Sequence, residues 1–306
     1  MKSKLKIIAF IFSILISSCG DGKKNAEETR PEIISQNPIN NKGVFIDHKI
    51  HGSGEYTLLF IHGWCINQSY WDEQVKSLQS EYRIVTIDLP GFGESGKNRK
   101  SWSIEKYGED VNAVIEQLKL TNVILIGHSM GGNVAVEAAL KNQNIIAVIG
   151  IDNFKDLGVE YDQDIKDQIN DFMELLKNNF SAIAPAYAEG SLFHSSTSSI
   201  VKNRVMNDFK NSDSIAAISS LEALISYGNI ESDQLRKLNQ KLYLINSNAS
   251  PTDKSGLEET GIDFQVVEID STGHFPMIEK PVEFNTLLKQ TIKKIEMAAR
   301  NNTYRQ

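Results

Sequence analysis

The stretch that decides the fold reads Val-Ile-Leu-Ile-Gly-His-Ser-Met-Gly-Gly at positions 123–132, and an alanine-rich segment follows it to about position 141. The four apolar residues predict a buried strand, and the segment after the glycines predicts a helix. Gly-x-Ser-x-Gly between a strand and a helix indicates a tight turn that exposes the serine hydroxyl, with glycines where a side chain would clash. Backbone N–H groups at the helix N-terminus can stabilise an oxyanion there. We therefore predict that Ser129 is a nucleophile and that the N–H of Met130 is an oxyanion donor.

Further apolar runs of strand length surround this motif. They lie at 57–61, 84–87, 145–151, 242–245 and 266–269. Because they are rich in Ile, Val and Leu without polar alternation, they are typical of strands buried on both faces. Amphipathic segments such as 103–120 separate them. The order predicts an α/β protein with a mostly parallel sheet flanked by helices, and an antiparallel edge strand at 44–50.

The alternation of strands and helices breaks once, between Asp152 and Lys241. Three helices are expected in this interval, at 167–180, 198–209 and 214–227. We interpret 153–240 as a helical cap inserted into a core formed by 43–152 and 241–296, with a polar tail at 297–306. Its larger apolar residues either roof a pocket or form the core of the cap itself; they are Phe172, Met173, Leu176, Phe180 and Tyr187.

Two other motifs follow predicted strands. His62-Gly63-Trp64 comes directly after the run at 57–61, where the N–H of Trp64 would supply a second oxyanion donor. Gly273-His274 follows the last strand, about 145 residues after the serine, which gives the chain order of a Ser-acid-His triad. Cys65 has no placed His or Asn partner, so we expect a packed residue and not a nucleophile.

Together these motifs resemble the α/β-hydrolase fold superfamily, in its branch with a helical cap, from about position 44 to 295. The matching residues are His62-Gly63-Trp64, the run Asp-Leu-Pro-Gly-Phe-Gly-Glu-Ser-Gly at 88–96, the Gly-His-Ser-Met-Gly-Gly at 127–132, and Gly273-His274. The resemblance implies an α/β-hydrolase fold whose helical cap lies between the sixth and seventh strands in the numbering of that family. It also implies that the loop at 88–96 shapes the rim of the pocket.

The acid of the triad has two candidates. The family usually places it in a turn after the strand corresponding to 242–245. If Pro251 marks the residue that usually follows the acid, the place of the acid is taken here by Ser250, and Asp253 lies three residues further on. Some members carry the acid after the preceding strand, where this chain has Asp152. Either aspartate could instead cap the segment that follows it. We favour Asp152 and keep Asp253 as the alternative.

These residues predict a serine hydrolase that cleaves a carboxylic ester or related acyl compound through an acyl-enzyme. The expected substrate is a small to medium-sized acyl compound with an apolar part. No cofactor is expected, and no metal either, since the His and Cys spacings are not those of a metal site. A carbon–carbon bond or thioester hydrolase would use the same triad. A different class of function is a non-catalytic, surface-tethered binding protein on a hydrolase scaffold.

The N-terminus predicts export. Three lysines at positions 2, 4 and 6 precede an apolar run at 7–16 and then Ser17-Ser18-Cys19. This is the pattern of a secretory signal peptide, and the run is shorter than the ~20 residues that cross a bilayer. Positions 16–19 resemble the lipobox of bacterial lipoproteins. We predict a signal peptide at 1–18, lipidation of Cys19, a polar tether at 19–42, and anchoring to a membrane on its periplasmic or outer-surface side.

The composition of the chain argues against one class of binding partner. The chain has 306 residues and a formal net charge of −7, from 32 Lys and Arg against 39 Asp and Glu. A chain of this length can bury a large core without disulfides or metals. An acidic balance argues against a nucleic-acid partner, because phosphate neutralisation requires an excess of basic residues.

Overall fold

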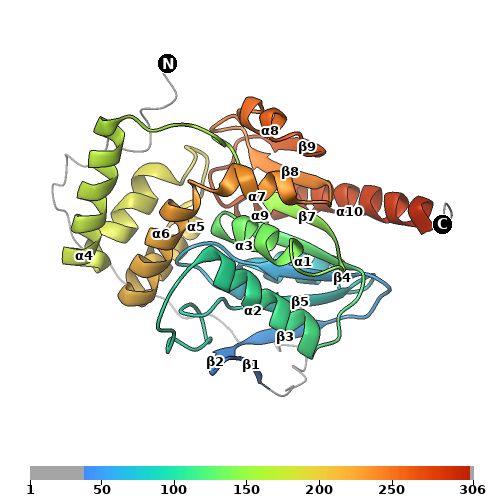
Figure 1. The fold of residues 1–306 in the computed structure, drawn as a ribbon. Coiled ribbons are helices and arrows are strands. Elements are labelled where there is room, and N and C mark those ends of the chain that lie inside the picture. The colour runs from blue at the N-terminus through green and yellow to red at the C-terminus, as the bar shows by residue number, and fades with distance from the viewer. Residues whose placement is uncertain (1–37, 304–306) are drawn as a thin grey trace.

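The computed structural model describes residues 38–303 and contains a seven-stranded sheet of order β3-β5-β4-β6-β7-β8-β9 (Figure 1). The strands of this sheet are β3 (His48–His51), β4 (Thr57–Ile61), β5 (Arg83–Ile87), β6 (Val123–His128), β7 (Ile145–Ile151), β8 (Leu242–Ser247) and β9 (Phe264–Ile269). Only β3 is antiparallel to its neighbour; every other pairing in the sheet is parallel. The mostly parallel sheet predicted from the apolar runs is therefore confirmed.

The central strands are buried along their whole length. Every residue of β4 and of β6 is buried, and the two strands pair with Leu59 opposite Leu125 and Ile61 opposite Gly127. Burying each Ile or Leu side chain contributes about 1.5–3 kcal/mol, and β-branched residues suit the pleated backbone. The polar residues that follow these strands are thereby held at one edge of the sheet, on a rigid support.

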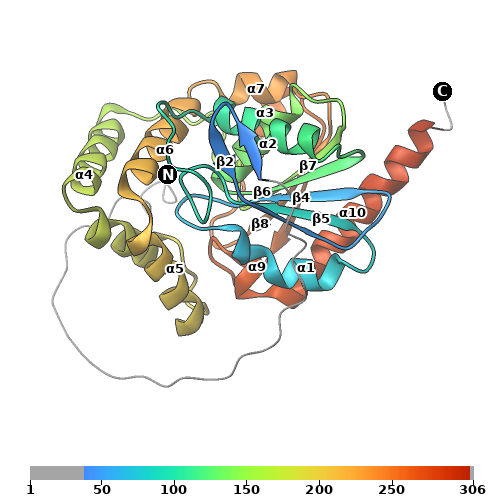
Figure 2. The same ribbon diagram turned by 90° about the horizontal axis from the view of Figure 1, so that it is seen from below.

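Helices cover both faces of the sheet (Figure 2). They are η1 (Gln68–Trp71), α1 (Asp72–Leu78), α2 (Ile104–Gln117), α3 (Met130–Ala139), α8 (Ser255–Thr260), α9 (Pro276–Glu279) and α10 (Pro281–Thr303). Helices α2 and α3 pack together on one face, and α1, α9 and α10 lie on the other. The Ser103 side chain starts α2 by accepting a hydrogen bond from the N–H of Lys106, because a helix leaves its first N–H groups unpaired.

A helical insertion lies between β7 and β8, at the place expected. It consists of α4 (Gln163–Ser191), α5 (Ser199–Asn211), α6 (Ser214–Tyr227) and α7 (Glu231–Lys237). Helix α4 runs well beyond the predicted 167–180 and bends at Asn179, whose backbone leaves the helical region. Helices α4, α5 and α6 project beyond the end of the sheet at which the parallel strands finish (Figures 1 and 2).

Three boundaries differ from those expected. Ile39–Asn41 forms β1, which pairs antiparallel with β2 (Val44–Ile46), so the end of the tether predicted at 19–42 belongs to the folded body. The single edge strand expected at 44–50 is two strands, because the chain leaves β2 at Asp47 and enters β3, which pairs with β5. Helix α10 continues to Thr303, through most of the stretch expected to be a polar tail.

The predicted signal peptide at 1–18 and lipidation site Cys19 lie outside the described residues and stay predictions. Within 38–303, no helix combines the length and the apolarity needed to span a bilayer.

Two glycines allow the close approach of β6, α3 and β4. A Cβ atom on Gly127 would lie 2.2 Å from the carbonyl oxygen of Gly131, and one on Gly131 would lie 2.6 Å from the carbonyl oxygens of Ile61 and His62. These neighbours are backbone atoms of packed elements, which cannot move aside without displacing the strand.

Replacing Gly127 by alanine is therefore expected to lower the free energy of unfolding by about 3 kcal/mol or more, or to abolish folding. Gly261→Ala is the matched control, since Gly261 has a φ of +73° but open space around its missing side chain. That variant should lose only about 1–2 kcal/mol from backbone strain. Urea unfolding followed by circular dichroism measures both, and equal midpoints for the two variants would contradict the packing argument.

Candidate active site

Ser129 lies at the junction of β6 and α3, in a strained backbone conformation. Its φ of 51° and ψ of −124° are outside the regions that L-residues usually adopt, at a cost of about 1–3 kcal/mol. The surroundings hold it there: its N–H donates to the carbonyl of Ile151 at 3.0 Å, and its carbonyl accepts from Gly132 N at 2.8 Å. The Asn153 side-chain amide also donates to the Ser129 carbonyl, at 2.7 Å. This is the geometry of a strand-turn-helix elbow that presents the serine at a helix N-terminus.

His274 and Asp152 are brought together from distant parts of the chain. The Nδ1 of His274 donates to the Oδ2 of Asp152 at 2.6 Å, across 122 positions of sequence. Because Nδ1 carries this hydrogen, the other ring nitrogen, Nε2, is the basic one in the neutral imidazole. The His274 carbonyl accepts a hydrogen bond of 2.7 Å from the Nε2 of His128, the residue before Ser129. The histidine loop is thus tied to the elbow.

Asp152 is buried at the end of β7 and is fully hydrogen-bonded. Its Oδ1 accepts from the N–H of Ser247 at 2.8 Å and lies 2.6 Å from the Nζ of Lys155, while its Oδ2 accepts from His274. Burial alone would raise the pKa of the Asp152 carboxyl. The hydrogen bond and charge of His274, together with the charge of Lys155, outweigh burial and lower the pKa to about 2. The carboxylate is therefore ionised throughout the neutral range.

The alternative acid has a different environment. Asp253 is exposed, and its Oδ1 accepts from the N–H and the hydroxyl of Ser255 at the start of α8. Ser250, at the place where the family usually has its acid, is exposed as well. Of the two aspartates weighed from the sequence, Asp152 is the one that contacts His274.

The two predicted oxyanion donors lie on neighbouring loops. Trp64 and Met130 follow β4 and β6, which pair side by side, and a Cβ on Gly63 would lie only 2.6 Å from the Nδ1 of His128. Among the residues that the structure describes, neither the Trp64 N–H nor the Met130 N–H donates to a protein acceptor, and no side chain caps α3. Two free N–H groups at this point can receive an oxyanion.

The family motifs around this point have supporting roles. His62 donates from Nδ1 to the Gly63 carbonyl at 2.7 Å and accepts at Nε2 from the N–H of Leu89 at 2.9 Å, so it joins the loops after β4 and β5. The Asp88 carboxylate accepts from the backbone N–H groups of Gln68 and Glu94. Burial lowers the pKa of His62, which therefore remains neutral.

The cap packs on Trp64. The indole N–H donates to the carbonyl of Ala217 in α6 at 2.7 Å, and the ring lies 6.2 Å from Phe180 and 5.3 Å from Phe209, between centroids. Tyr187 also contacts it, at 6.5 Å. Of the apolar cap residues singled out from the sequence, Phe180 and Tyr187 thus reach the site, whereas Met173 and Leu176 are buried and Phe172 packs on Tyr187. The contact of Phe209 with Trp64 was not predicted, because an apolar residue at helical spacing looks the same in sequence whichever residue it packs on.

The histidine loop is fixed to the cap and to α9. The N–H of His274 donates to the carbonyl of Leu192 at 2.7 Å. The Glu279 carboxylate accepts from Gly273 N at 2.8 Å, from Phe275 N at 3.0 Å, and from the hydroxyl of Thr197. Glu279, Asn153 and Lys155 were not singled out by sequence, since single polar residues in loops carry no periodic signal.

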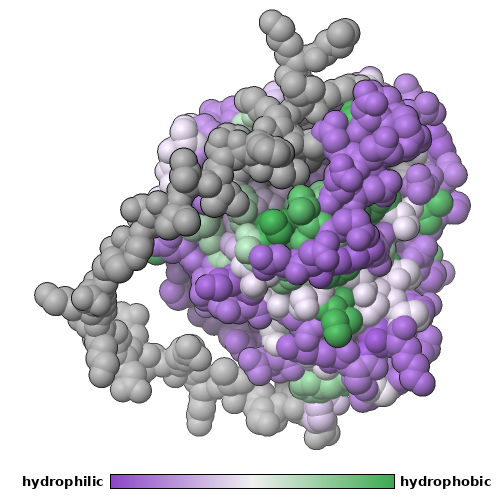
Figure 3. Space-filling view, turned by 90° about the vertical axis from the view of Figure 1, so that its left-hand side faces the viewer, coloured by the Kyte–Doolittle hydropathy of each residue, from purple (hydrophilic) through white to green (hydrophobic). Residues whose placement is uncertain are grey.

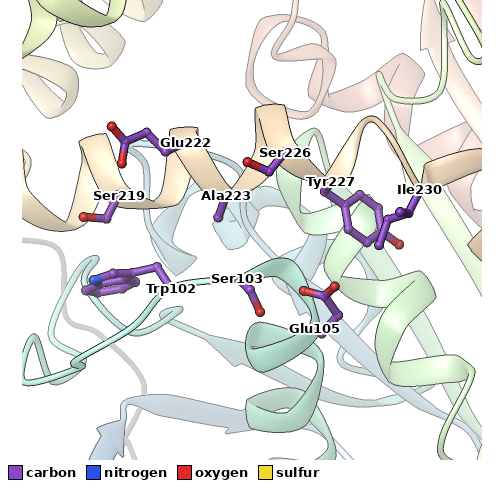
Figure 4. A pocket seen from close by; sticks show the side chains of 9 residues that line it. All are labelled: Trp102, Ser103, Glu105, Ser219, Glu222, Ala223, Ser226, Tyr227 and Ile230. Atoms are coloured by element: carbon purple, nitrogen blue, oxygen red, sulfur yellow. The ribbon is translucent and has the colours of Figure 1, made fainter.

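Two hollows lie beside the cap. A crevice of about 410 Å³ separates α6 from the start of α2 (Figure 4). Its lining residues are Trp102, Ser103, Glu105, Ser219, Glu222, Ala223, Ser226, Tyr227 and Ile230. A smaller hollow of about 170 Å³ is lined by Gly91, Phe92 and Gly93 of the 88–96 loop, together with Cys65 and residues at and just after the end of α5. The 88–96 loop therefore borders a hollow between the core and the cap.

The outer surface at the cap end is mostly hydrophilic, with small separate apolar patches (Figure 3). Ile200 of α5 and Ile215 of α6 are exposed by 80% and 75%. Isolated exposed residues of this kind are ordinary on a soluble surface.

Comparison with known proteins assigns the family. Residues 56–281 match the family described as alpha/beta hydrolase fold. The AB hydrolase superfamily protein YisY of Bacillus subtilis (strain 168) is 32% identical over 101 residues, which are 33% of this chain and only 37% of that relative.

Solved structures resemble nearly the whole described fold. A bromoperoxidase from Bacillus anthracis superposes with a TM-score of 0.73 and 22% identity, covering 84% of this chain and 98% of its own. A thermophilic esterase from Thermogutta terrifontis gives a TM-score of 0.73 and 19% identity, covering 87% and 99%. The family match extends from the strand before His62 to the start of α10, so it includes the elbow, the cap and the histidine loop, and this chain belongs to the alpha/beta hydrolase fold family.

Proposed function

We propose that the protein is a serine hydrolase that cleaves a carboxylic ester, or a related acyl compound, through an acyl-enzyme. The observation that carries this proposal is the 2.6 Å hydrogen bond between His274 and the buried, ionised Asp152, next to a serine in an elbow conformation. A carboxylate in this position fixes the tautomer of the imidazole and stabilises the imidazolium that forms during reaction.

The reaction has two halves. The Nε2 of His274 takes the proton of Ser129, and the serine oxygen forms a bond to the substrate carbonyl carbon. The N–H groups of Trp64 and Met130 stabilise the oxyanion, which collapses as the protonated histidine gives its proton to the departing alcohol. Water activated by the same histidine then attacks the acyl-enzyme, releasing the acid and restoring Ser129.

The aromatic cluster above Trp64 favours an acyl substrate of small to medium size with an apolar part. Phe180, Tyr187 and Phe209 surround the indole ring, so the cap residues nearest the proposed oxyanion donor are apolar. The same serine, histidine and acid would serve a thioester or a carbon–carbon bond hydrolase. A panel of p-nitrophenyl esters and acyl thioesters of increasing chain length separates ester from thioester specificity.

Labelling with a fluorophosphonate probe tests the enzyme class, because the probe forms a covalent bond only with an activated serine. The expected result is one adduct, located at Ser129 by peptide mass spectrometry, in native but not in unfolded protein. The variant Ser129→Ala should remain unlabelled. Absence of an adduct on native protein would favour the non-catalytic binding protein and overturn the proposal.

A further inference from the structure

Lys155 makes an ion pair with the proposed triad acid. Its Nζ lies 2.6 Å from the Oδ1 of Asp152 and donates to the carbonyl of Ser247 at 2.9 Å. Only 14% of the Lys155 side chain and 5% of the Asp152 side chain are exposed. The contact is therefore a largely desolvated one, and not a surface ion pair of small effect.

We propose that Lys155 is a positioning residue that sets the pH range in which the Ser-His-Asp arrangement works, and this rests on the proposed function. Asp152 is shared: one oxygen serves His274 and the other serves Lys155. The ammonium charge reduces the stabilisation that the carboxylate gives to a protonated imidazole. The charge of Lys155 therefore opposes the positive charge that the imidazole gains during the reaction, and its removal should move the acidic limb of the activity to higher pH.

The sign of the effect follows from the charges around the pair. His128 lies 4.7 Å from His274 between ring centroids, and burial, followed by the charge of His274, lowers the pKa of His128 to about 3, so it is neutral. From α9, Glu279 is engaged by the backbone N–H groups on either side of His274. The cap contributes His194, whose Nδ1 bonds the hydroxyl of Ser196. Among the described residues, Lys155 is the only lysine or arginine in an ion pair with Asp152.

Lys155 also has a place in the chain that suits a positioning role. The insertion begins immediately after Asp152, and its first residues return to the site: Asn153 bonds the Ser129 carbonyl, and Lys155 bonds Asp152. The Lys155 carbonyl accepts from the N–H of Asp253, which joins this segment to the loop after β8. The same short segment thus contacts both the nucleophile and the acid.

The test compares Lys155→Gln with Lys155→Arg. Glutamine keeps an N–H donor on the side chain but removes the charge, whereas arginine keeps the charge. The pH dependence of kcat/KM for p-nitrophenyl acetate should show its acidic limb at higher pH in the Gln variant, by about one unit, as expected for losing a charge a few ångströms away. The Arg variant should follow the wild type. Acidic limbs that superimpose in wild type and the Gln variant would overturn the proposal.

A second measurement does not depend on turnover. The chain has six histidines, so the imidazole resonances can be followed by ¹⁵N NMR and that of His274 assigned with His274→Gln. In Lys155→Gln the pH at which the His274 resonances change should be higher than in wild type. An unchanged pH would refute the role of Lys155. If the NMR shift is found but no Ser129-dependent hydrolysis, the proposed function fails and the electrostatic effect of Lys155 stands.

Discussion

Replacing Ser129 by alanine is expected to lower kcat for a p-nitrophenyl ester by about 10⁴- to 10⁶-fold, the largest effect of any substitution in the site. The alanine cannot form the acyl-enzyme, so only the oxyanion donors and substrate binding remain to accelerate attack by water. KM should change little, because the hydroxyl contributes to the reaction and not to ground-state binding.

The fold of the Ser129→Ala variant should be retained. Alanine has the same backbone restrictions as serine, and the contacts that hold residue 129 are made by its N–H and carbonyl with Ile151, Gly132 and Asn153. Ser255→Ala is a matched control, since Ser255 is exposed at the start of α8. Initial rates of both variants beside wild type, with circular dichroism spectra of each, measure the effect. Turnover near the wild-type level in Ser129→Ala would exclude the serine as nucleophile.

The sheet was predictable because its signal is local. Strands buried on both faces must be apolar throughout, and the run at 57–61 coincides with β4 for this reason. The strand ends were less predictable. Strand β8 continues to Ser247, a polar residue whose side chain bonds a backbone carbonyl of the histidine loop and whose N–H bonds Asp152. Such residues are kept in a strand by tertiary hydrogen bonds that carry no apolar pattern.

The cap was located from sequence, but its detailed shape was not. Between β7 and β8 the sequence contains no apolar run of the strand type, and this break in the alternation located the insertion. Helix α4 was expected to end near Phe180, yet it continues past the bend at Asn179 and includes Pro185. A proline disfavours the helix interior, but here the residues that follow pack on Trp64 and stabilise the extension.

Within the site, the elbow that one turn of the chain forms was predictable, whereas the contacts that depend on neighbouring strands were not. The elbow is encoded in ten consecutive residues. The environment of Asp152 depends instead on the pairing of β7 with β8, which places Ile151 beside Ile245 and brings the Asp152 carboxylate to the N–H of Ser247. From the sequence, Asp152 was favoured over Asp253 only through the resemblance to family members that carry the acid after this strand. Only the register of distant strands distinguishes the one that meets His274.

Asp152→Asn is expected to lower kcat by about 10³- to 10⁴-fold while leaving the protein folded. An asparagine amide at this point can donate to Nδ1 of His274, which favours the tautomer with its hydrogen on Nε2, the wrong nitrogen for accepting the serine proton. It also cannot stabilise the imidazolium by charge. Asp253→Asn is the matched control and should turn over at close to the wild-type rate, because its carboxylate contacts Ser255 at an exposed loop.

Measuring the free energy of unfolding beside turnover distinguishes an electrostatic role of Asp152 from a general disruption of the site. Asp152→Asn leaves the Lys155 ammonium without its anion in a largely buried position, which should lower the free energy of unfolding by about 3 kcal/mol or more. Adding Lys155→Gln removes that unpaired charge, so the double variant should regain most of the stability but none of the turnover. Urea unfolding and ester hydrolysis measured on the same three variants test this. A double variant that regained activity with stability would show that Asp152 acts through packing alone, because a charge-dependent step cannot be restored by an amide pair.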